Sequence, residues 1–278
     1  MQSKMQKASH PILSRVLSVS LAIVAAAGLC GLLIKNTVLH AATAPKGNAG
    51  GWACPDPATA PHTQEGDAIR LGKQIFDGTP KYAAAYTGNQ LSCNDCHIGS
   101  GTTDHAAPMV GISGIFPMYT KRAGRVISLQ QRIQECFTRS ENGTPPPIDS
   151  KEMKALTAYI DLLTPVEKKG EVYPGRGLVQ LPALTGDPKH GGAIYAQQCA
   201  SCHGDDGAGM PSAFPPLWGP GAYNDGAGMH GIAKMAAFLV PNMPQDNPGT
   251  LSPQDAYDVA AYIHAKPHPK FNPAYKGY

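Results

Sequence analysis

Two stretches of the chain repeat the same helical spacing of apolar positions, and each begins just after a serine, Ser150 or Ser252. Serine is a favoured N-cap residue because its hydroxyl accepts a hydrogen bond from a backbone N–H of the first helical turn. The matching positions are Glu152, Leu156, Tyr159 and Ile160 in the first stretch, and Asp255, Val259, Tyr262 and Ile263 in the second. The pattern predicts one helix of the same kind in each half of the chain.

The longest apolar run lies near the N-terminus and is typical of an export signal. Residues 16–34 carry no charge, and Lys4, Lys7 and Arg15 precede them. Small residues follow at 41–44, where Ala42 and Ala44 offer a cleavage site. A run of 19 residues is also nearly long enough to span a bilayer. We therefore expect residues 1–44 to be a signal peptide or a membrane anchor, and the remaining chain to be periplasmic.

The chain after this leader is close to neutral and rich in residues that interrupt helices. Four of the 23 basic residues lie in the first 44 positions, which leaves 19 basic against 20 acidic residues. That balance gives no electrostatic basis for binding nucleic acid. The 278 residues include 31 Gly and 26 Pro, a composition that favours short helices wrapped by loops over a long helical bundle.

Two copies of the pattern C-x-x-C-H indicate the chemistry. They comprise Cys93, Cys96 and His97, and Cys199, Cys202 and His203. A random chain of this composition would contain about 0.006 such matches. Two thiols one helical turn apart add to the two vinyl groups of one haem, and the following imidazole ligates the iron. A zinc site would need two more thiols or imidazoles nearby, and a redox dithiol would not need the histidine twice. The sequence therefore predicts two covalently bound haem c groups.

The chain also repeats itself around these motifs. Gly72-x-x-x-Phe76 precedes the first, and Gly191-x-x-x-Tyr195 precedes the second. We expect each glycine to let two helices approach closely, and each aromatic ring to pack beside a haem. Residues 168–186 are rich in Gly and Pro and lack periodicity. The prediction is an all-α fold of two tandem class I cytochrome c-like domains, residues 45–170 and 171–278, each with one covalently bound haem c, joined by a long irregular linker.

A methionine stands where the second unit needs a further iron ligand. Met243 follows His203 by 40 residues, in a loop. A His/Met pair favours ferrous iron and suits electron transfer. Met229 and Met235 are alternative ligands, in which case Met243 would only pack. The carbonyl of Pro215 is expected to accept the N–H of His203 and so fix the imidazole.

The first unit has a cysteine at the matching position. Cys136 follows His97 by 39 residues, and the nearest methionines are Met118 and Met153. A thiolate ligand is anionic and favours ferric iron, so this haem would have the lower potential and electrons would run from the first haem to the second. A lone cysteine is also commonly a small buried hydrophobe, and the spacing by itself leaves both interpretations open.

Basic residues gather around this cysteine. If the stretch is one helix, its positions share one face: Arg125, Arg132, Cys136, Arg139 and, one turn after the cysteine, Ser140. We expect at least one of the arginines to pair with a haem propionate. A cluster of guanidinium groups facing a thiolate would also hold small dianions.

Four stretches, in chain order over residues 50–270, carry a resemblance to a known family. They are Gly88-Asn89-x-Leu91-x-Cys93-Asn94-x-Cys96-His97, Arg132-Ile133-x-x-Cys136-Phe137-x-Arg139-Ser140-x-Asn142-Gly143, Phe214-Pro215-Pro216-Leu217-Trp218-Gly219 and Asn242-Met243-Pro244. In them the chain resembles the thiosulfate dehydrogenase (tetrathionate-forming) family of dihaem c-type cytochromes. The second stretch is the specific one, because the others occur in many cytochromes.

The resemblance implies an oxidoreductase that couples two thiosulfates into tetrathionate and releases two electrons, and some members run the reverse reaction. It implies a His/Cys first haem at the active site and a His/Met second haem as the electron exit. The electron acceptor would be a small periplasmic cytochrome c or a high-potential iron–sulfur protein.

The mechanism is a hypothesis built on these residues. Three arginines and a serine bind thiosulfate: Arg125, Arg132, Arg139 and Ser140. The sulfur of Cys136 forms a covalent link to the sulfane sulfur of one thiosulfate, and the second thiosulfate attacks that adduct. Neutralisation of charge is essential, since two dianions must approach each other.

Other classes stay open on the sequence alone. A dihaem electron shuttle without a substrate would need no reactive Cys136. A dihaem peroxidase would need acid–base residues, for which His105 is the candidate after the first motif. A sulfur-carrier cytochrome of another oxidation pathway could also have a cysteine-ligated haem.

Overall fold

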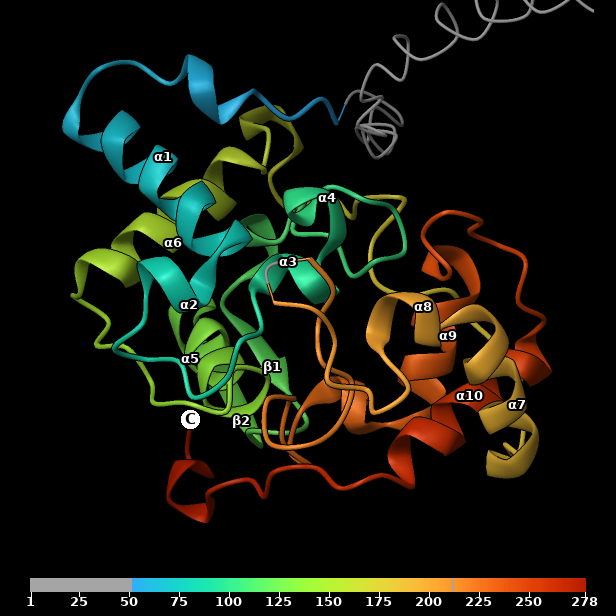
Figure 1. Cartoon of the computed structure of the whole chain (residues 1–278). Coiled ribbons are helices and arrows are strands. Elements are labelled where there is room, and N and C mark those ends of the chain that lie inside the picture. Colours follow the sequence, from blue (N-terminus) through green and yellow to red (C-terminus); the bar gives the residue numbers. More distant parts are fainter. Residues whose placement is uncertain (1–51, 212) are drawn as a thin grey trace, which may run out of the picture. The chain divides into compact units, whose positions relative to one another are not determined.

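The computed structural model describes residues 52–211 and 213–278, and in these ranges the chain is mostly helical (Figure 1). The elements in chain order are α1 (Gln64–Asp77), α2 (Thr79–Tyr82), α3 (Cys93–Cys96), α4 (Ile98–Gly101), β1 (Met118–Thr120), β2 (Arg125–Ile127), α5 (Leu129–Arg139), α6 (Lys151–Leu162), α7 (Pro188–Gln198), α8 (Ala200–His203), α9 (Ile232–Asn242) and α10 (Pro253–His264). Short 3-10 turns lie between several of them. The all-α prediction is confirmed, with one two-stranded hairpin as an addition.

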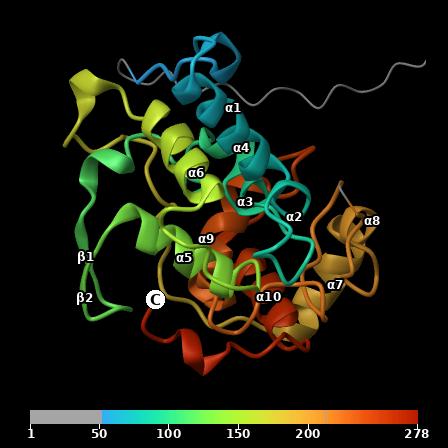
Figure 2. The same cartoon turned by 90° about the vertical axis from the view of Figure 1, so that its left-hand side faces the viewer.

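Helices α1 and α6 pack side by side and form the core of the first half (Figures 1 and 2). The hydroxyl of Ser150 accepts a hydrogen bond from the N–H of Met153 and caps α6, as the sequence predicts. A Cβ atom on Gly72 would lie 2.0 Å from the carbonyl oxygen of Ala155, so only glycine lets the two helices come this close. Phe76, four residues on, is 2% exposed and packs edge-on against Tyr159.

Helices α7 and α10 repeat this arrangement in the second half. Ser252 caps α10 by accepting a hydrogen bond from the N–H of Asp255. A Cβ atom on Gly191 would lie 1.9 Å from the carbonyl oxygen of Asp258. The predicted role of both glycines is thereby confirmed: each sits where two helices leave no room for a side chain.

Replacing Gly191 with alanine should destabilise the protein more than replacing its neighbour. The new methyl group would meet backbone atoms of α10, which cannot move without separating the helices. We expect Gly191→Ala to lower the free energy of unfolding by about 3 kcal/mol. Guanidinium unfolding of the haem-loaded protein, followed by circular dichroism, measures this loss. In the control Gly192→Ala the nearest atoms belong to the movable ring of Tyr262, at 3.0 Å, and equal losses in the two variants would contradict the prediction.

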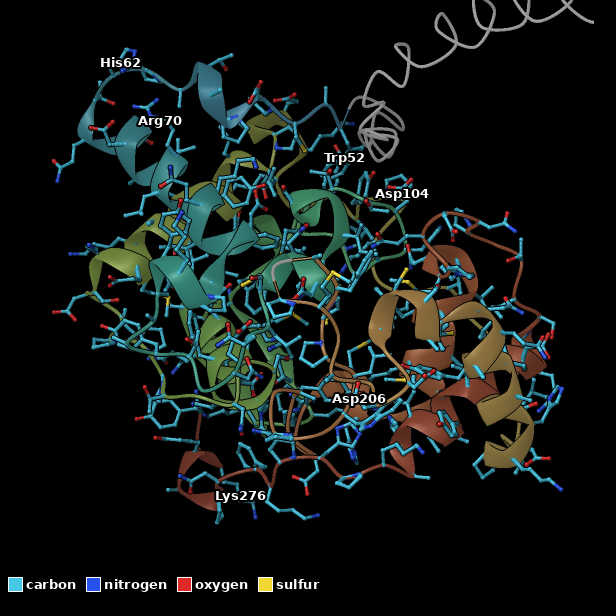
Figure 3. All side chains as sticks on the ribbon, viewed as in Figure 1. Trp52, His62, Arg70, Asp104, Asp206 and Lys276 are labelled. Carbon is cyan, nitrogen blue, oxygen red and sulfur yellow. The ribbon has the colours of Figure 1, made fainter. Side chains whose placement is uncertain are left out.

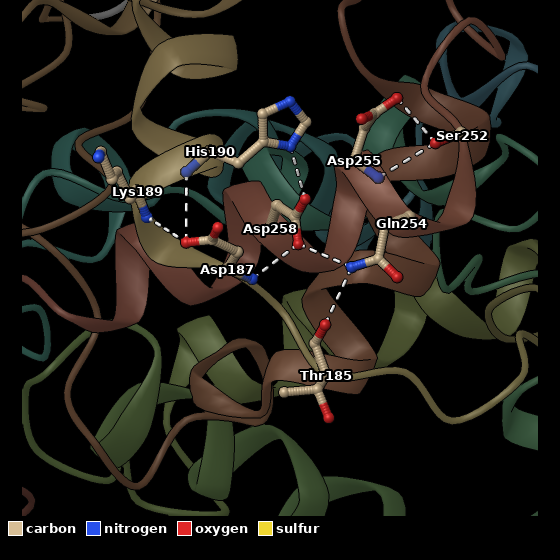
Figure 4. A network of polar contacts seen from close by, with 8 residues as sticks. All are labelled: Thr185, Asp187, Lys189, His190, Ser252, Gln254, Asp255 and Asp258. Carbon is tan, nitrogen blue, oxygen red and sulfur yellow. Dashed lines mark hydrogen bonds and ion pairs between the residues drawn. The ribbon is translucent and has the colours of Figure 1, made fainter.

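A polar network at the start of α7 further fastens it to α10 (Figure 4). The carboxylate of Asp258, 3% exposed, accepts hydrogen bonds from the N–H of Asp187 at 2.7 Å and from Nε2 of Gln254 at 2.8 Å. Nδ1 of His190 lies 2.8 Å from its other oxygen. Burial alone would raise the pKa of Asp258, but these hydrogen bonds outweigh it and hold the pKa below its usual value. The carboxylate therefore stays ionised and joins α10 to Asp187, the residue that caps α7.

The hairpin of β1 and β2 lies beside α5 and changes one prediction (Figure 2). Helix α5 begins only at Leu129, because Ser128 and Gln131 form a capping box that ends the extended segment. The expected helix over residues 125–140 is therefore too long. Arg125 lies in β2, paired with Thr120, and does not share a helical face with Cys136.

Two asparagines fasten the second half of the chain to the end of α5. Nδ2 of Asn89 donates hydrogen bonds to the carbonyls of Ser140 at 2.8 Å and Ala222 at 3.1 Å. Nδ2 of Asn224 donates to the carbonyl of Thr138 at 2.9 Å. The segment around residue 223 thus packs against the first half, although it follows the second C-x-x-C-H motif.

Residues 169–187 contain no helix or strand, as expected for an irregular linker. The domain limits proposed from the sequence, 45–170 and 171–278, stay a prediction. In the part of the chain that the structure describes, no helix has both the length and the apolar character needed to cross a membrane. The leader expected at residues 1–44 lies outside the described residues.

Candidate functional site

The first C-x-x-C-H motif opens onto a cavity of about 270 Å³. Cys93 and Cys96 of α3 and the following His97 line it, and so do Arg132 and Cys136 of α5. The rest of the lining is mainly apolar and includes Phe76, Leu91, Met109, Leu129, Ile133, Leu156 and Ile160. An apolar cavity that joins two thiols, an imidazole and a third thiol has the donor set and the walls that a haem c with His97 and Cys136 as axial ligands requires. The residues present therefore fit this group.

His97 is oriented by a backbone carbonyl. Its Nδ1 lies 2.6 Å from the oxygen of Ala107. A hydrogen bond at Nδ1 leaves the lone pair of Nε2 directed away from the backbone, which is the arrangement of a metal-binding histidine. Burial lowers the pKa of His97 to about 4, and the charge of Arg132 adds to this. The imidazole is therefore neutral at pH 7, the form that binds a metal.

The second motif has the same arrangement. Nδ1 of His203 lies 2.9 Å from the carbonyl oxygen of Pro215, the contact that the sequence predicts. Burial lowers the pKa of His203, so this imidazole is also held neutral. Met243 follows α9 and packs, partly buried, against the same core as Cys199 and Leu217.

The alternative methionines, Met229 and Met235, belong to the same core as Met243. Met229 lines the cavity of the first motif, and Met235 is 3% exposed within the core of the second half. Met229 and Met243 are both partly buried against this core, and Met243 differs in following directly on the last residue of α9. Its role as iron ligand stays a prediction, supported by this position.

Arg132 and Cys136 form a close pair one turn apart on α5. Nη1 of Arg132 lies 3.1 Å from the sulfur of Cys136 and 3.5 Å from Oε2 of Glu135, whose side chain is 2% exposed. Attraction to Cys136 raises the pKa of Arg132 above its usual range. A guanidinium at this distance gives the sulfur the positive neighbour that a thiolate requires.

The structure brings together some of the predicted substrate-binding residues and not others. Ser140 lines the cavity with Arg132 and Cys136. Arg139 is 7% exposed and is directed elsewhere, with Nη1 3.4 Å from the carbonyl of Gly226 and its guanidinium 4.1 Å from the centre of the Phe271 ring.

Arg125 is also outside the cavity lining. It is exposed, and its Nη2 donates to the carbonyl of Gly277 at 2.9 Å. Its expected place beside Cys136 depended on a helix that begins four residues later. No described contact supports a substrate-binding role for Arg125 or Arg139.

The cavity lining also includes residues that the sequence did not place beside the first motif. Arg176 comes from the linker, Glu141 follows Ser140, and Tyr223 and Met229 come from the second half of the chain. Burial raises the pKa of Glu141 well above its usual value, and Asp95 adds to this. The sequence offered one indication for Arg176, which is a basic residue between two glycines, Gly175 and Gly177. The other three reach the cavity by packing that no local pattern reveals.

These two centres define the class of the protein: a c-type cytochrome with two covalently bound haem c groups. Family models agree, since residues 77–164 match the cytochrome c domain of SoxA/TsdA and residues 186–263 match subunit III of the cbb3-type cytochrome c oxidase. The chain belongs to the thiosulfate dehydrogenase family and is an oxidoreductase of that type.

Its relatives and a solved structure support this assignment. The chain is 42% identical over 222 residues to thiosulfate dehydrogenase of Stutzerimonas stutzeri, covering 78% of this chain and 72% of the relative. It is 39% identical over 230 residues to that of Allochromatium vinosum, covering 78% and 84%. Thiosulfate dehydrogenase (TsdBA) from Marichromatium purpuratum superposes with a TM-score of 0.72 at 37% identity, covering 77% of this chain and 48% of that one. The chain thus spans about half the length of the solved TsdBA chain.

Proposed function

We propose that the protein oxidises two thiosulfates to one tetrathionate in the cavity of the first motif, releasing two electrons that leave through the second. The observation that carries the proposal is the pair of Arg132 and Cys136 in the same cavity as Cys93, Cys96 and His97. Family membership supports thiosulfate as the substrate. The same steps in reverse would cleave tetrathionate.

Substrate binding is a problem of charge, since two dianions must approach each other. Arg132 supplies a permanent positive charge 3.1 Å from the sulfur of Cys136. Ser140, which lines the same cavity, can donate a hydrogen bond to a sulfonate oxygen. Apolar walls lower the local dielectric and strengthen both interactions. We therefore place the sulfonate group of the first thiosulfate at Arg132 and Ser140, with its sulfane sulfur toward Cys136.

The covalent chemistry then balances in two steps. The thiolate of Cys136 and the sulfane sulfur of one thiosulfate form an S–S bond with loss of two electrons, which leaves a cysteine S-thiosulfonate. The sulfane sulfur of the second thiosulfate attacks the outer sulfur of that bond. Tetrathionate forms and the thiolate of Cys136 is restored. One-electron uptake at each of two iron centres is the chemistry that the bound haems supply.

Residues of the second motif would serve as the electron exit. Cys199, Cys202, His203 and Met243 would hold the second haem, and a His/Met pair favours a higher potential than His/Cys. We propose a small periplasmic cytochrome c or a high-potential iron–sulfur protein as acceptor, and export of the chain by its N-terminal apolar segment.

Mixing the oxidised protein with thiosulfate under anaerobic conditions tests the proposed function. We expect the haem absorption bands to change to those of the reduced form, with one tetrathionate for every two electrons taken up. Sulfate, a dianion without a sulfane sulfur, should leave the bands unchanged. Bands that stay oxidised in thiosulfate would instead favour an electron shuttle without this substrate.

A further inference from the structure

The linker segment that carries Arg176 is hydrogen-bonded to the loop that orients the proximal histidine of the first motif. The carbonyl of Gly175 accepts the N–H of His105 at 2.9 Å, and the carbonyl of Gly177 accepts the N–H of Ala107 at 3.0 Å. Ala107 is also the residue whose carbonyl orients that histidine. Arg176 therefore stands between two backbone hydrogen bonds at the edge of the cavity.

A buried tyrosine fixes the backbone just before Arg176. Tyr173 is 1% exposed, its ring packs edge-on against Trp52 with centroids 5.4 Å apart, and its hydroxyl donates to Asp104 (Figure 3 labels Trp52 and Asp104). The carbonyl of Tyr173 accepts the N–H of Arg176 at 3.0 Å. A Cβ atom on Gly175 would lie 2.3 Å from Oδ1 of Asp104, so a side chain here would displace the carboxylate that Tyr173 binds. These contacts fix the position of the backbone at Arg176.

The charges of the cavity leave this guanidinium without a protein partner. The lining contains two arginines, Arg132 and Arg176, and one acid, Glu141. Arg132 is already engaged by Cys136. Among the residues that the structure describes, none forms an ion pair or a side-chain hydrogen bond with Arg176.

Arg176 is partly buried and lines a largely apolar cavity, where its charge is incompletely solvated and an anionic partner is favoured. Haem carries two propionate carboxylates, and the planar fork of arginine matches a carboxylate with two parallel hydrogen bonds. The sequence predicts a propionate partner among three arginines. Arg125 and Arg139 are engaged outside the cavity lining, at Gly277 and Gly226. Arg132 lies in the cavity beside Cys136, where it is assigned to the thiolate and the substrate.

We propose that Arg176 binds an anionic oxygen group inside the first haem cavity, and that this group is a propionate of the haem. The linker then has a function beyond joining two domains, because it supplies the counter-ion of the first haem from outside both C-x-x-C-H units. A positive charge in this position stabilises the reduced, more negative form of the centre and raises its potential.

Spectroelectrochemistry of Arg176→Gln without substrate tests the proposal. We expect the midpoint potential of the first haem to fall while that of the second haem is unchanged. The propionate bending modes in the resonance Raman spectrum should shift, which a purely structural role of Arg176 would not cause. Arg176→Lys retains the charge without the fork, and should restore most of the potential but not the Raman modes. This variant also keeps the test valid if Arg176→Gln folds poorly.

A steady-state measurement separates the two sources of anionic oxygen. If Arg176 instead binds the sulfonate of the substrate, KM for thiosulfate rises about tenfold or more, as expected for loss of a charge-assisted hydrogen bond, and the potential and Raman modes stay the same. That result keeps the anion site and overturns its assignment to the haem.

Lys169→Gln is the matched control, because it removes one positive charge from an exposed position of the same linker. If Arg176→Gln changes potential, Raman modes and KM no more than Lys169→Gln does, Arg176 binds no anion and the proposal is overturned. The haem readouts do not require thiosulfate, so a failure of the proposed function would leave them interpretable.

Discussion

Replacing Cys136 with glycine should abolish thiosulfate oxidation while both haems remain attached. The attachment thiols lie in other segments, at Cys93, Cys96, Cys199 and Cys202. The sulfur of Cys136 lies in the cavity 3.1 Å from Nη1 of Arg132, and the proposed S–S bond cannot form without it. We expect the turnover number to fall by about 10³-fold or more, as it does when an enzyme loses its nucleophile. The pyridine haemochrome assay measures whether both haems remain attached. Steady-state assays with an artificial electron acceptor measure the loss of turnover.

Cys54 provides the matched control. It is a half-buried thiol outside the cavity, and burial raises its pKa to about 11, so it stays protonated. Cys54→Ala should therefore retain native turnover. Substantial activity in Cys136→Gly would remove Cys136 from the mechanism. An unchanged spectrum of the first haem in that variant would also remove it as an axial ligand.

Arg132→Gln should be the second most damaging change. The guanidinium is in direct contact with the sulfur of Cys136, at 3.1 Å, and it serves both the thiolate and the incoming dianion. Loss of such a preorganised donor costs about 10²–10³-fold in rate, and we expect that loss in kcat/KM for thiosulfate. The kcat/KM of Arg132→Lys should lie between those of the native protein and Arg132→Gln, because lysine keeps the positive charge but lacks the planar fork of the guanidinium. Steady-state rates over a range of ionic strength measure the effect.

Arg70→Gln is the control for a general loss of positive charge. Arg70 lies on α1 and pairs with Asp67 outside the cavity lining, so its loss should leave kcat/KM close to native. If Arg132→Gln behaves in the same way, the dianion binds elsewhere and the proposed site is wrong.

The sequence by itself determined the features that depend on neighbouring residues. Haem attachment needs two thiols and an imidazole within five positions, so the C-x-x-C-H motifs reveal it directly. The N-caps Ser150 and Ser252 act within one helical turn and are confirmed. Gly72 and Gly191 were also identified correctly, because the repeat places the same close approach of two helices in each half of the chain.

Only the tertiary structure decided which charged groups reach the cavity. Equal spacing suggested one helical face for Arg125, Arg132 and Arg139, but the capping box at Ser128 starts α5 after Arg125. Packing against Gly226 and Phe271 directs Arg139 away from the cavity. Arg176 enters it because two backbone hydrogen bonds and a buried tyrosine hold an irregular linker in place. Such contacts join residues far apart in the chain, and the order of residues near each one does not reveal its partner.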